Sequence, residues 1–237
     1  SYYYIPRSLK KVTITGGNIL YRAFEYCDSL TSVVISDNVT SIGNSAFSRC
    51  STLTSVEIGN SVTSIGEGAF SDCSSLTSVV IPNSITSIGD YAFADCNSLA
   101  TLTIPNSVKS IEYAAFQGCS SLTSITVPSG NIASYAFSYC SDLTSVSIGS
   151  GVTNIGTDAF GYCNDLASIR VINSNAYYDS RENCNAIIET ATNKLIQGCN
   201  STIIPSSVTK IGGDACSGWT RQGTDGSPER RTTRATD

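Results

Sequence analysis

One pattern of apolar and polar positions recurs along most of the chain, at a step close to 23 residues. Residues 53–73 read L-T-S-V-E-I-G-N-S-V-T-S-I-G-E-G-A-F-S-D-C. The alternating apolar positions at the start predict a short half-buried strand, and V-T-S-I predicts a second extended stretch after a Gly-Asn turn. We predict that residues 67–74 then form about one helical turn, which buries the Ala, the Phe and the Cys on one face.

The Ala-Phe pair, with a Cys three residues after the Phe, marks seven units. Successive Phe residues lie 23, 23, 23, 23, 21 and 23 positions apart, a period typical of a solenoid in which each unit buries its apolar face against its neighbours. Stacking at ~4.8 Å per coil would place Phe on Phe and Cys on Cys. Units 9–24 and 122–137 are two residues shorter, and we expect their second extended stretch to be abbreviated. The cysteines of the seven units are Cys27, Cys50, Cys73, Cys96, Cys119, Cys140 and Cys163.

The repeat S-L-T-S-V-x-I-P-N-S-V-T-S-I-G-x-x-A-F-x-x-C resembles the BspA-like leucine-rich repeat, also called the Treponema-type repeat, over residues 8–172. Leu53, Val56 and Ile58 show the L-x-x-L-x-L spacing of a leucine-rich-repeat strand. The predicted fold is a leucine-rich-repeat solenoid, β-rich within the α/β class. The resemblance implies a secreted or surface-displayed protein. Such proteins of oral and gut anaerobes, and of some mucosal protists, are associated with adhesion to host matrix proteins, other cells or surfaces.

We divide the chain into four predicted segments. The repeat array covers residues 1–172, and residues 173–200, which lack the Ala-Phe-x-x-Cys signature, predict a β-hairpin insertion. Residues 201–216 resume the repeat. Residues 217–237 form a non-repeat polar tail, which predicts a disordered or poorly packed segment. A truncated array with an out-of-pattern tail and a native linker both fit this composition.

The cysteines favour structural roles over chemistry. Spacings of 21 and 23 residues do not give the C-x-x-C grouping of a metal site, so we interpret the repeat cysteines as buried core thiols. Cys184 and Cys199 lie outside the repeat, and they would face each other if the hairpin turned at residues 191–192. For this pair we predict a disulfide, with two free thiols as the open alternative.

Composition restricts the function. Only 14% of the residues are charged and the formal net charge is -5, which argues against a nucleic-acid-binding surface. The chain has no His, which excludes Ser-His and Cys-His catalysis and His-containing zinc sites. Asp72, Asp95, Asp142 and Asp165 lie scattered on turns without a converging partner, and no phosphate-loop motif occurs. We therefore predict no enzyme, no metal and no cofactor, and the lack of an 18-residue apolar run predicts no membrane span.

Three exposed columns are candidate binding surfaces. On the strand face, one column is uniformly Ser or Thr and its neighbour varies in size and charge, and we take Glu57, Thr103, Thr126 and Arg170 from the variable column as binding residues. Tyrosines beside the turn segment form the second candidate, because Tyr is enriched at interfaces. They are Tyr26, Tyr91, Tyr113, Tyr135, Tyr139 and Tyr162. The third is a hydroxyl column that Lys109 interrupts, made of Thr40, Thr63, Thr86 and Thr153.

These observations predict a non-catalytic protein that is secreted or displayed on the cell surface. We expect it to be a monomer that binds host or bacterial surface macromolecules, either protein or glycan, and that functions in adhesion. The alternative is a structural spacer that displays another module. An ice- or crystal-binding surface, formed by the threonine column, is the third hypothesis.

Overall fold

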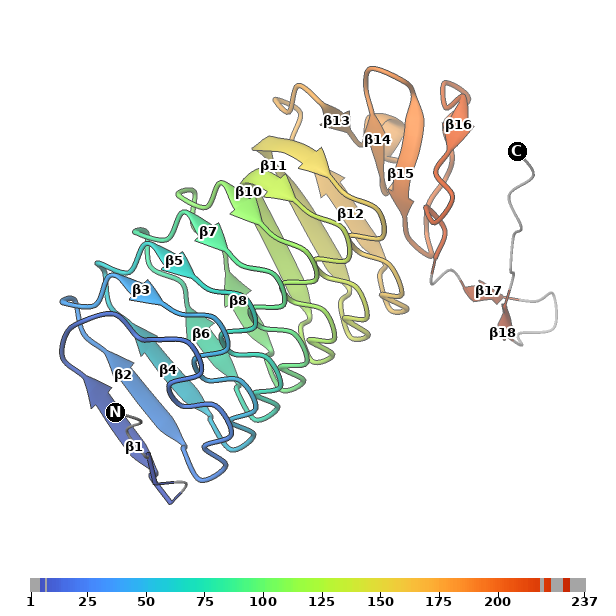
Figure 1. The fold of residues 1–237 in the computed structure, drawn as a ribbon. Coiled ribbons are helices and arrows are strands. Elements are labelled where there is room, and N and C mark those ends of the chain that lie inside the picture. The colour runs from blue at the N-terminus through green and yellow to red at the C-terminus, as the bar shows by residue number, and fades with distance from the viewer. Residues whose placement is uncertain (1–4, 7, 218–219, 223–227, 231–237) are drawn as a thin grey trace.

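The computed structural model describes residues 5–6, 8–217, 220–222 and 228–230. It is a solenoid of stacked coils that runs from the N-terminal unit to the insertion at the other end (Figure 1). Equivalent strands of neighbouring coils pair in parallel and in register, as Val33 with Val56 and Val79 with Leu102 do. Pairing of identical positions follows from the repeat, because any slip would move the apolar set to the solvent face. The predicted β-rich solenoid is confirmed.

Two parallel sheets form the sides of the array. The first contains, in spatial order, β1 (Lys11–Ile14), β2 (Ser32–Ile35), β4 (Ser55–Ile58), β6 (Ser78–Val80) and β8 (Thr101–Thr103). The second contains β12 (Ser168–Val171), β11 (Ser145–Ile155), β10 (Ser124–Ile132), β9 (Ser110–Ile111), β7 (Ser87–Ile88), β5 (Ser64–Ile65) and β3 (Ser41–Ile42).

The two short units behave differently from each other. In unit 9–24 the second stretch is reduced to one bridge between Ile19 and Ile42, as predicted. In unit 122–137 it is not abbreviated, because β10 runs without a break through both extended stretches. β10 is two residues shorter than β11, the continuous strand of the next, full-length unit. Its pairing with β11 absorbs the difference through register shifts around Ser129 and Gly130.

The segment that carries Ala-Phe-x-x-Cys is not helical, so the predicted helical turn is wrong. Within the described residues, the one helical element is the 3-10 turn η1 (Arg181–Asn183) of the insertion. Along this segment, successive backbone N–H groups donate alternately to a carbonyl of the same coil and to a carbonyl of the next coil. The N–H of Phe70, for example, donates to the Ala92 carbonyl at 2.7 Å, whereas that of Cys73 donates to the Phe70 carbonyl at 3.3 Å. A helix would direct every N–H along its own axis and leave the next coil without partners.

This alternation requires left-handed backbone on both sides of each Phe. The residues two positions before and two positions after it have positive φ in all seven units, and most of them are not Gly. They are Arg22, Tyr26, Ser45, Arg49, Gly68, Asp72, Tyr91, Asp95, Ala114, Gly118, Tyr135, Tyr139, Asp158 and Tyr162. A left-handed conformation costs a non-glycine residue about 1–2 kcal/mol, so bonding between coils stabilises a conformation that the single residues disfavour.

A reciprocal pair of substitutions tests this conformational cost. Gly68 has φ +57° and an added Cβ would meet nothing closer than 3.5 Å, so Gly68→Ala is expected to lower the free energy of unfolding by about 1 kcal/mol through the backbone alone. Ser45 holds the same position one coil earlier at φ +54°, and Ser45→Gly is expected to raise it by about 0.5 kcal/mol, since glycine also gains freedom in the unfolded chain. Urea unfolding followed by far-UV circular dichroism measures both. Changes of the same sign would contradict the argument.

The core consists of two ladders that run through the array. Phe rings of adjacent coils stack nearly parallel, with centroids 5.0–5.5 Å apart from Phe24 to Phe160. Beside them each Cys Sγ from Cys50 onward contacts the carbonyl oxygen of the Phe one coil earlier, as Cys96 does with Phe70 at 3.2 Å. Cys suits this position because it is small and apolar and still donates a weak hydrogen bond. The prediction of buried core thiols is confirmed.

The insertion forms a sheet of its own beyond β12. Its strands, in spatial order, are β13 (Tyr178–Asp179), β14 (Ala186–Glu189), β15 (Lys194–Gly198) and β16 (Lys210–Ile211). The Asn175 amide nitrogen donates to the carbonyls of Gly149 and Val152 at 2.8 and 2.9 Å, and the Tyr178 hydroxyl accepts the Ile155 N–H at 3.0 Å. These side chains satisfy backbone groups at the open edge of β11, which would otherwise lack partners.

The register of β14 and β15 changes between its two ends. Near the turn Glu189 pairs with Lys194, as a turn at residues 191–192 requires. One extra residue on β15 then shifts the register, and Ala186 pairs with Gly198. Such a bulge places two residues of one strand opposite one residue of the other.

Because of this bulge, Cys199 faces Asn185 and not Cys184. The Cys199 Sγ contacts the Asn185 carbonyl at 3.3 Å. Cys199 belongs to the main core, whereas Cys184 packs in a separate cluster with Ile188 and Leu195. The structure describes both as buried free thiols, so the expectation that they face each other is wrong.

The end of the chain lies mostly outside the described residues. Of the predicted tail at 217–237, the structure describes Ser217, β17 (Thr220–Gln222) and β18 (Pro228–Arg230), and the two strands pair antiparallel. The prediction that this tail is disordered or poorly packed falls on residues 218–219, 223–227 and 231–237, outside the described ones, and stays a prediction. The segment boundaries at 172, 200 and 216 also stay predictions.

Candidate functional site

The strand-face residues expected from the sequence lie in one exposed row. The pairing of Val34 with Glu57, Val80 with Thr103, and Ser147 with both Thr126 and Arg170 places them at equivalent positions of successive coils. All four side chains are exposed. Glu57 and Arg170 are five coil steps apart, roughly 24 Å at ~4.8 Å per step, so they do not form one compact site.

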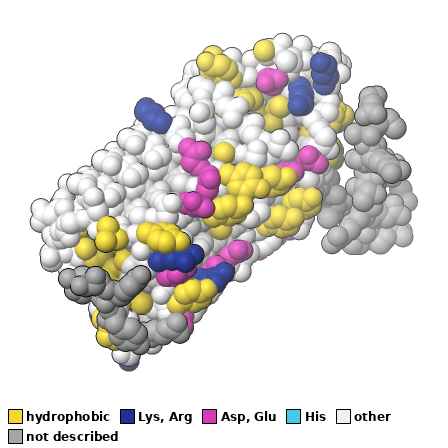
Figure 2. Space-filling model, in the orientation of Figure 1, with side chains coloured by type: hydrophobic (Ala, Val, Ile, Leu, Met, Phe, Trp, Pro, Cys, Tyr) yellow, Lys and Arg dark blue, Asp and Glu magenta, His cyan; other side chains and the backbone are white. Residues whose placement is uncertain are grey.

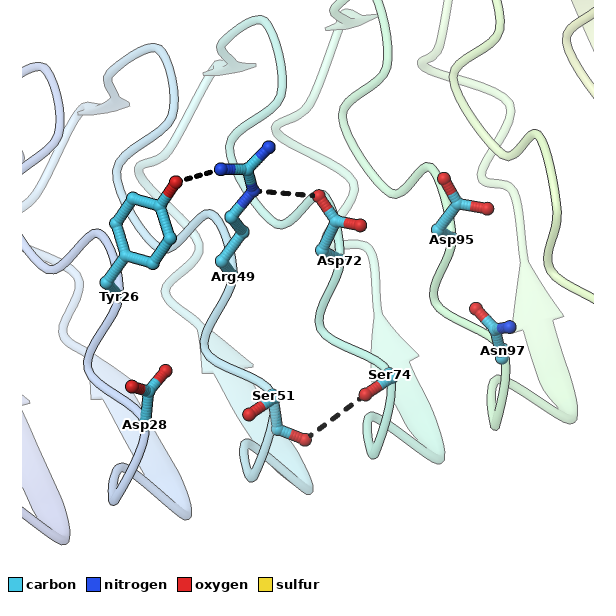
Figure 3. Close-up of a pocket in the computed structure, with 8 residues that line it drawn as sticks. All are labelled: Tyr26, Asp28, Arg49, Ser51, Asp72, Ser74, Asp95 and Asn97. Atoms are coloured by element: carbon cyan, nitrogen blue, oxygen red, sulfur yellow. Dashed lines mark hydrogen bonds and ion pairs between the residues drawn. The ribbon is translucent and has the colours of Figure 1, made fainter.

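The turn face is built differently. We use this name for the surface formed by the residues around each Ala-Phe-x-x-Cys. Two of its columns, at the second residue after each Phe and at the residue after each Cys, enclose a groove of about 560 Å³ across four coils (Figure 3). Its lining residues are Tyr26, Asp28, Arg49, Ser51, Asp72, Ser74, Asp95 and Asn97.

Arg49 joins three coils at this groove. Its guanidinium lies 5.1 Å from the centre of the Tyr26 ring and donates to the Tyr26 hydroxyl, and its Nε lies 3.4 Å from Asp72 Oδ2 (Figure 3). The pair with Asp72 is about half exposed and contributes little to stability. The contact matters for its geometry, because it shows that the turn face can hold a guanidinium between a phenol ring and a carboxylate. Asp72 and Asp95 had been expected to lie scattered without a partner, and for Asp72 that expectation is wrong.

Asp95 continues the column one coil further. Within the described part of the chain its carboxylate makes no ion pair and no hydrogen bond. Partial burial, and then the negative charge of Asp72, raise the pKa of Asp95 above its ordinary value. A carboxylate in this situation gains from a cation that is brought next to it.

Further tyrosines form two groups on the turn face. Tyr91, Tyr113 and Tyr135 form a row of edge-to-face contacts, with centroids 5.4 and 5.6 Å apart. Tyr139 and Tyr162 stack in parallel at 4.6 Å. Hydrophobic side chains gather midway along the solenoid in Figure 2, and acidic side chains lie beside them. The ring contacts hold exposed aromatic surface in a fixed arrangement.

From Glu67 to Asp165 the charged side chains of the turn face are all acidic. Lys109 is the one basic residue between Glu67 and Asp165, and it lies in the threonine column on another face. The charge of Asp158 is the largest cause of the raised pKa of Tyr135, while for Tyr91 it is partial desolvation, followed by its contact with Tyr113. The sequence could have indicated this surface if the residues two positions after each Phe had been aligned as a column.

The threonine column uses its hydroxyls within the stack. Thr63 and Thr86 each donate to the carbonyl of the preceding threonine of the column at 3.3 Å, and Thr40 donates to Asn18 Oδ1 at 2.7 Å. Thr153 donates in the same way to Asn131 at 2.7 Å. Hydroxyl groups that already donate within the stack are not free to donate to ice or to another crystal surface.

Other features give few candidates. A second cavity of about 100 Å³ lies between the last full coil and the resumed unit, with Asp158 and Lys194 among its lining residues. Among the described residues, no three His, Cys, Asp or Glu side chains are grouped so that they could hold a metal ion. In the same part of the chain, no helix has the length and apolarity that a membrane crossing needs.

Comparisons with known proteins agree with the fold. The family model described as BspA type leucine rich repeat region (6 copies) matches residues 17–132, 64–187 and 130–221. No curated protein matches the chain.

Solved structures of bacterial repeat proteins are similar to this chain. A Treponema pallidum leucine rich repeat protein is 29% identical with a TM-score of 0.60, over 67% of this chain and 78% of the other. A leucine rich cell surface protein from Faecalibacterium prausnitzii is 27% identical with a TM-score of 0.59, over 90% of this chain and 62% of the other. The pneumococcal vaccine antigen PcpA, 18% identical with a TM-score of 0.58, shares the fold over 87% of this chain and 52% of its own length. The chain thus spans less than two thirds of two of these proteins.

Proposed function

The chain belongs to the BspA-type leucine-rich repeat family, and from this membership we propose that it is a non-catalytic protein that binds macromolecules outside the cell or at its surface. Its turn face is the contact surface. The observation that carries the proposal is a fixed row of solvent-accessible tyrosines on a turn face that also carries an open groove. Large aromatic side chains held by neighbours lose little conformational entropy on binding, which favours affinity.

The names of two similar proteins support the proposed location. One similar protein is described as a leucine rich cell surface protein and another as a vaccine antigen. We propose an extracellular site of action, and with it a monomeric state and adhesion to host or bacterial surface proteins or glycans. No catalytic role is proposed, because the described residues offer no grouping of nucleophile, base and orienting residue.

The strand face is the competing surface. Its candidates Glu57, Thr103, Thr126 and Arg170 are exposed but separated along the array, and Val80, which lies between two of them, is 74% exposed. Residues spread along an open row offer a partner less enclosed contact area than a groove does. The spacer hypothesis has its own support in the unbroken Phe ladder, which makes the array a rod that could hold a module away from a surface.

A pair of triple variants separates these surfaces. Tyr91→Ser/Tyr113→Ser/Tyr135→Ser is expected to weaken binding to an immobilised surface partner at least tenfold, because it removes the fixed aromatic row. Glu57→Lys/Thr103→Lys/Arg170→Glu is expected to change it less than twofold. Binding to fibronectin, collagen, mucin and glycan arrays is measured by surface plasmon resonance, and circular dichroism checks that each variant is folded.

The reverse ranking would place the contact on the strand face. If the unaltered chain bound none of the probes, the proposal of adhesion would fail and the spacer hypothesis would replace it.

A further inference from the structure

One column of the turn face has a gap at Gly118. The second residue after each Phe is, in order, Tyr26, Arg49, Asp72, Asp95, Gly118, Tyr139 and Tyr162. Every member of this column except Gly118 carries a large or charged side chain. The Asp95 carboxylate leans over Gly118, at the place that a Cβ would take. On the other side of the gap, Tyr139 stacks on Tyr162.

The same column contains a filled version of this arrangement. Arg49 lies between Tyr26 and Asp72, and Gly118 lies between Asp95 and Tyr139, so both central positions have a carboxylate on one side and a phenol ring on the other, in opposite order along the array. The coil steps are also alike. They measure 5.0 and 5.2 Å between Phe rings around Arg49, and 5.2 and 5.3 Å around Gly118. What the second arrangement lacks is the guanidinium.

We propose that the turn face binds an arginine-bearing segment of a partner protein and that one guanidinium of this segment lies over Gly118, between Asp95 and Tyr139. This inference rests on the proposed macromolecule-binding function and specifies its partner chemistry. A guanidinium is planar, stacks on aromatic rings and donates to carboxylates at the same time, whereas a lysine ammonium offers only a point charge. Arg22 over the Tyr21 ring at 4.8 Å is a second internal example of the same contact.

Charge complementarity extends beyond the single position. From Glu67 to Asp165 the turn face carries acidic side chains without a basic one, and the open groove ends at Asp95, one coil before Gly118. A cationic segment that lies along the coils would meet carboxylates on its path and aromatic edges at its end. An anionic partner would be repelled by the same surface.

The substitution Gly118→Arg supplies the missing group from the chain itself. Gly118 has φ +72° and Arg49 has φ +61°, so an arginine at this position adopts a backbone conformation that the column already contains. The side chain that must move is the flexible carboxylate of Asp95. We expect this variant to fold and to occupy its own site.

The test uses fluorescein-labelled hexa-arginine and hexa-lysine, with fluorescence anisotropy at pH 7 and low salt. Hexa-arginine is expected to bind the native chain about fivefold more tightly than hexa-lysine. Gly118→Arg and Asp95→Asn are each expected to weaken hexa-arginine binding about fivefold. Thr63→Arg, which changes the net charge as Gly118→Arg does but on another exposed face, is the matched control and is expected to change it less than twofold.

Equal binding of the two peptides would overturn the inference. Equal loss in Gly118→Arg and Thr63→Arg would do the same, because it would reduce the effect to net charge. Whichever of fibronectin, collagen, mucin or the glycans binds the native chain is then tested with Gly118→Arg. If that partner binds Gly118→Arg as well as the native chain, the proposed function stands and the arginine site is wrong. If hexa-arginine behaves as expected but no surface macromolecule binds, the arginine site stands and the proposed function fails.

Discussion

Above about pH 10 the reduced protein is expected to unfold cooperatively, because the cysteine ladder that forms its core cannot ionise in place. The pKa of Cys50 is raised to about 12, chiefly by burial. Burial likewise raises the pKa of Cys73, Cys96 and Cys119, and for Cys140 the contact with Cys163 comes first and burial second. In the unfolded chain each of these thiols titrates near its ordinary value of 9.0.

The direction of the effect follows from proton binding. Between the unfolded and the folded pKa, the native state keeps a proton that the unfolded state has lost, so the free energy of unfolding falls as pH rises. Each thiol contributes a loss of about 1.4 kcal/mol per pH unit in this range, and the five together lose about 7 kcal/mol per unit. A domain with about 5–15 kcal/mol of stability therefore reaches its midpoint within one or two units above pH 9.

Far-UV circular dichroism between pH 7 and 11.5, in the presence of a phosphine reductant, measures the midpoint and its steepness. The triple variant Cys73→Ala/Cys96→Ala/Cys119→Ala is the informative comparison. It is less stable at pH 7, because cavities form, but its stability should fall less steeply with pH since three titrating groups are gone. An unchanged slope would contradict the assignment of the alkaline transition to the ladder.

The sequence predicts the Phe and Cys ladders because a repeat restricts the ways in which the chain can pack. Identical side chains at identical intervals bury one another when the coils stack in register, and this fixes the neighbours of Phe70 and Cys96 without knowledge of any turn geometry. The parallel strands follow from the same argument, since Val33 and Val56 occupy the same position of their units.

The backbone of the turn segment could not be predicted in this way. Tyr, Arg and Asp at positive φ carry no local sequence signal, because the cause lies in hydrogen bonds to a coil 23 residues away. The predicted register of Cys184 and Cys199 was wrong for a similar reason. A bulge of one residue in β15, which nothing in the hairpin sequence announces, moved one thiol out of line.

The composition of the turn face, which we propose as the contact surface, could be predicted in part. The tyrosines beside the turn were recognised from their type and place, but the contact of Arg49 with Tyr26 and Asp72 was not, because residues 23 positions apart become neighbours only after stacking. The strand-face residues illustrate the opposite situation, and their role stays a prediction. Their variation in size and charge suggested a site, whereas the fold spreads them along an open row.

Phe93→Ala is expected to destabilise the array by about 3–5 kcal/mol, the range for removing a large buried aromatic side chain. The Phe93 ring is fully buried and stacks on Phe70 and Phe116, both at 5.2 Å. The coils above and below are tied by strand pairing and cannot collapse into the space, so most of the cavity should remain. Phe24→Ala is the control, since Phe24 is partly exposed and has one stacking neighbour, and it should cost clearly less.

The position of the substitution within the ladder has a second consequence. In a linear array each coil touches only its neighbours, so stability is a sum of unit and interface contributions. A cavity at Phe93 weakens the interfaces in the middle of the ladder, and urea unfolding should then separate into two transitions with smaller m-values, whereas Phe24→Ala should leave one transition. A single transition of unchanged m-value in Phe93→Ala, with the expected loss of stability, would mean that cooperativity is carried by the sheets and not by the aromatic ladder.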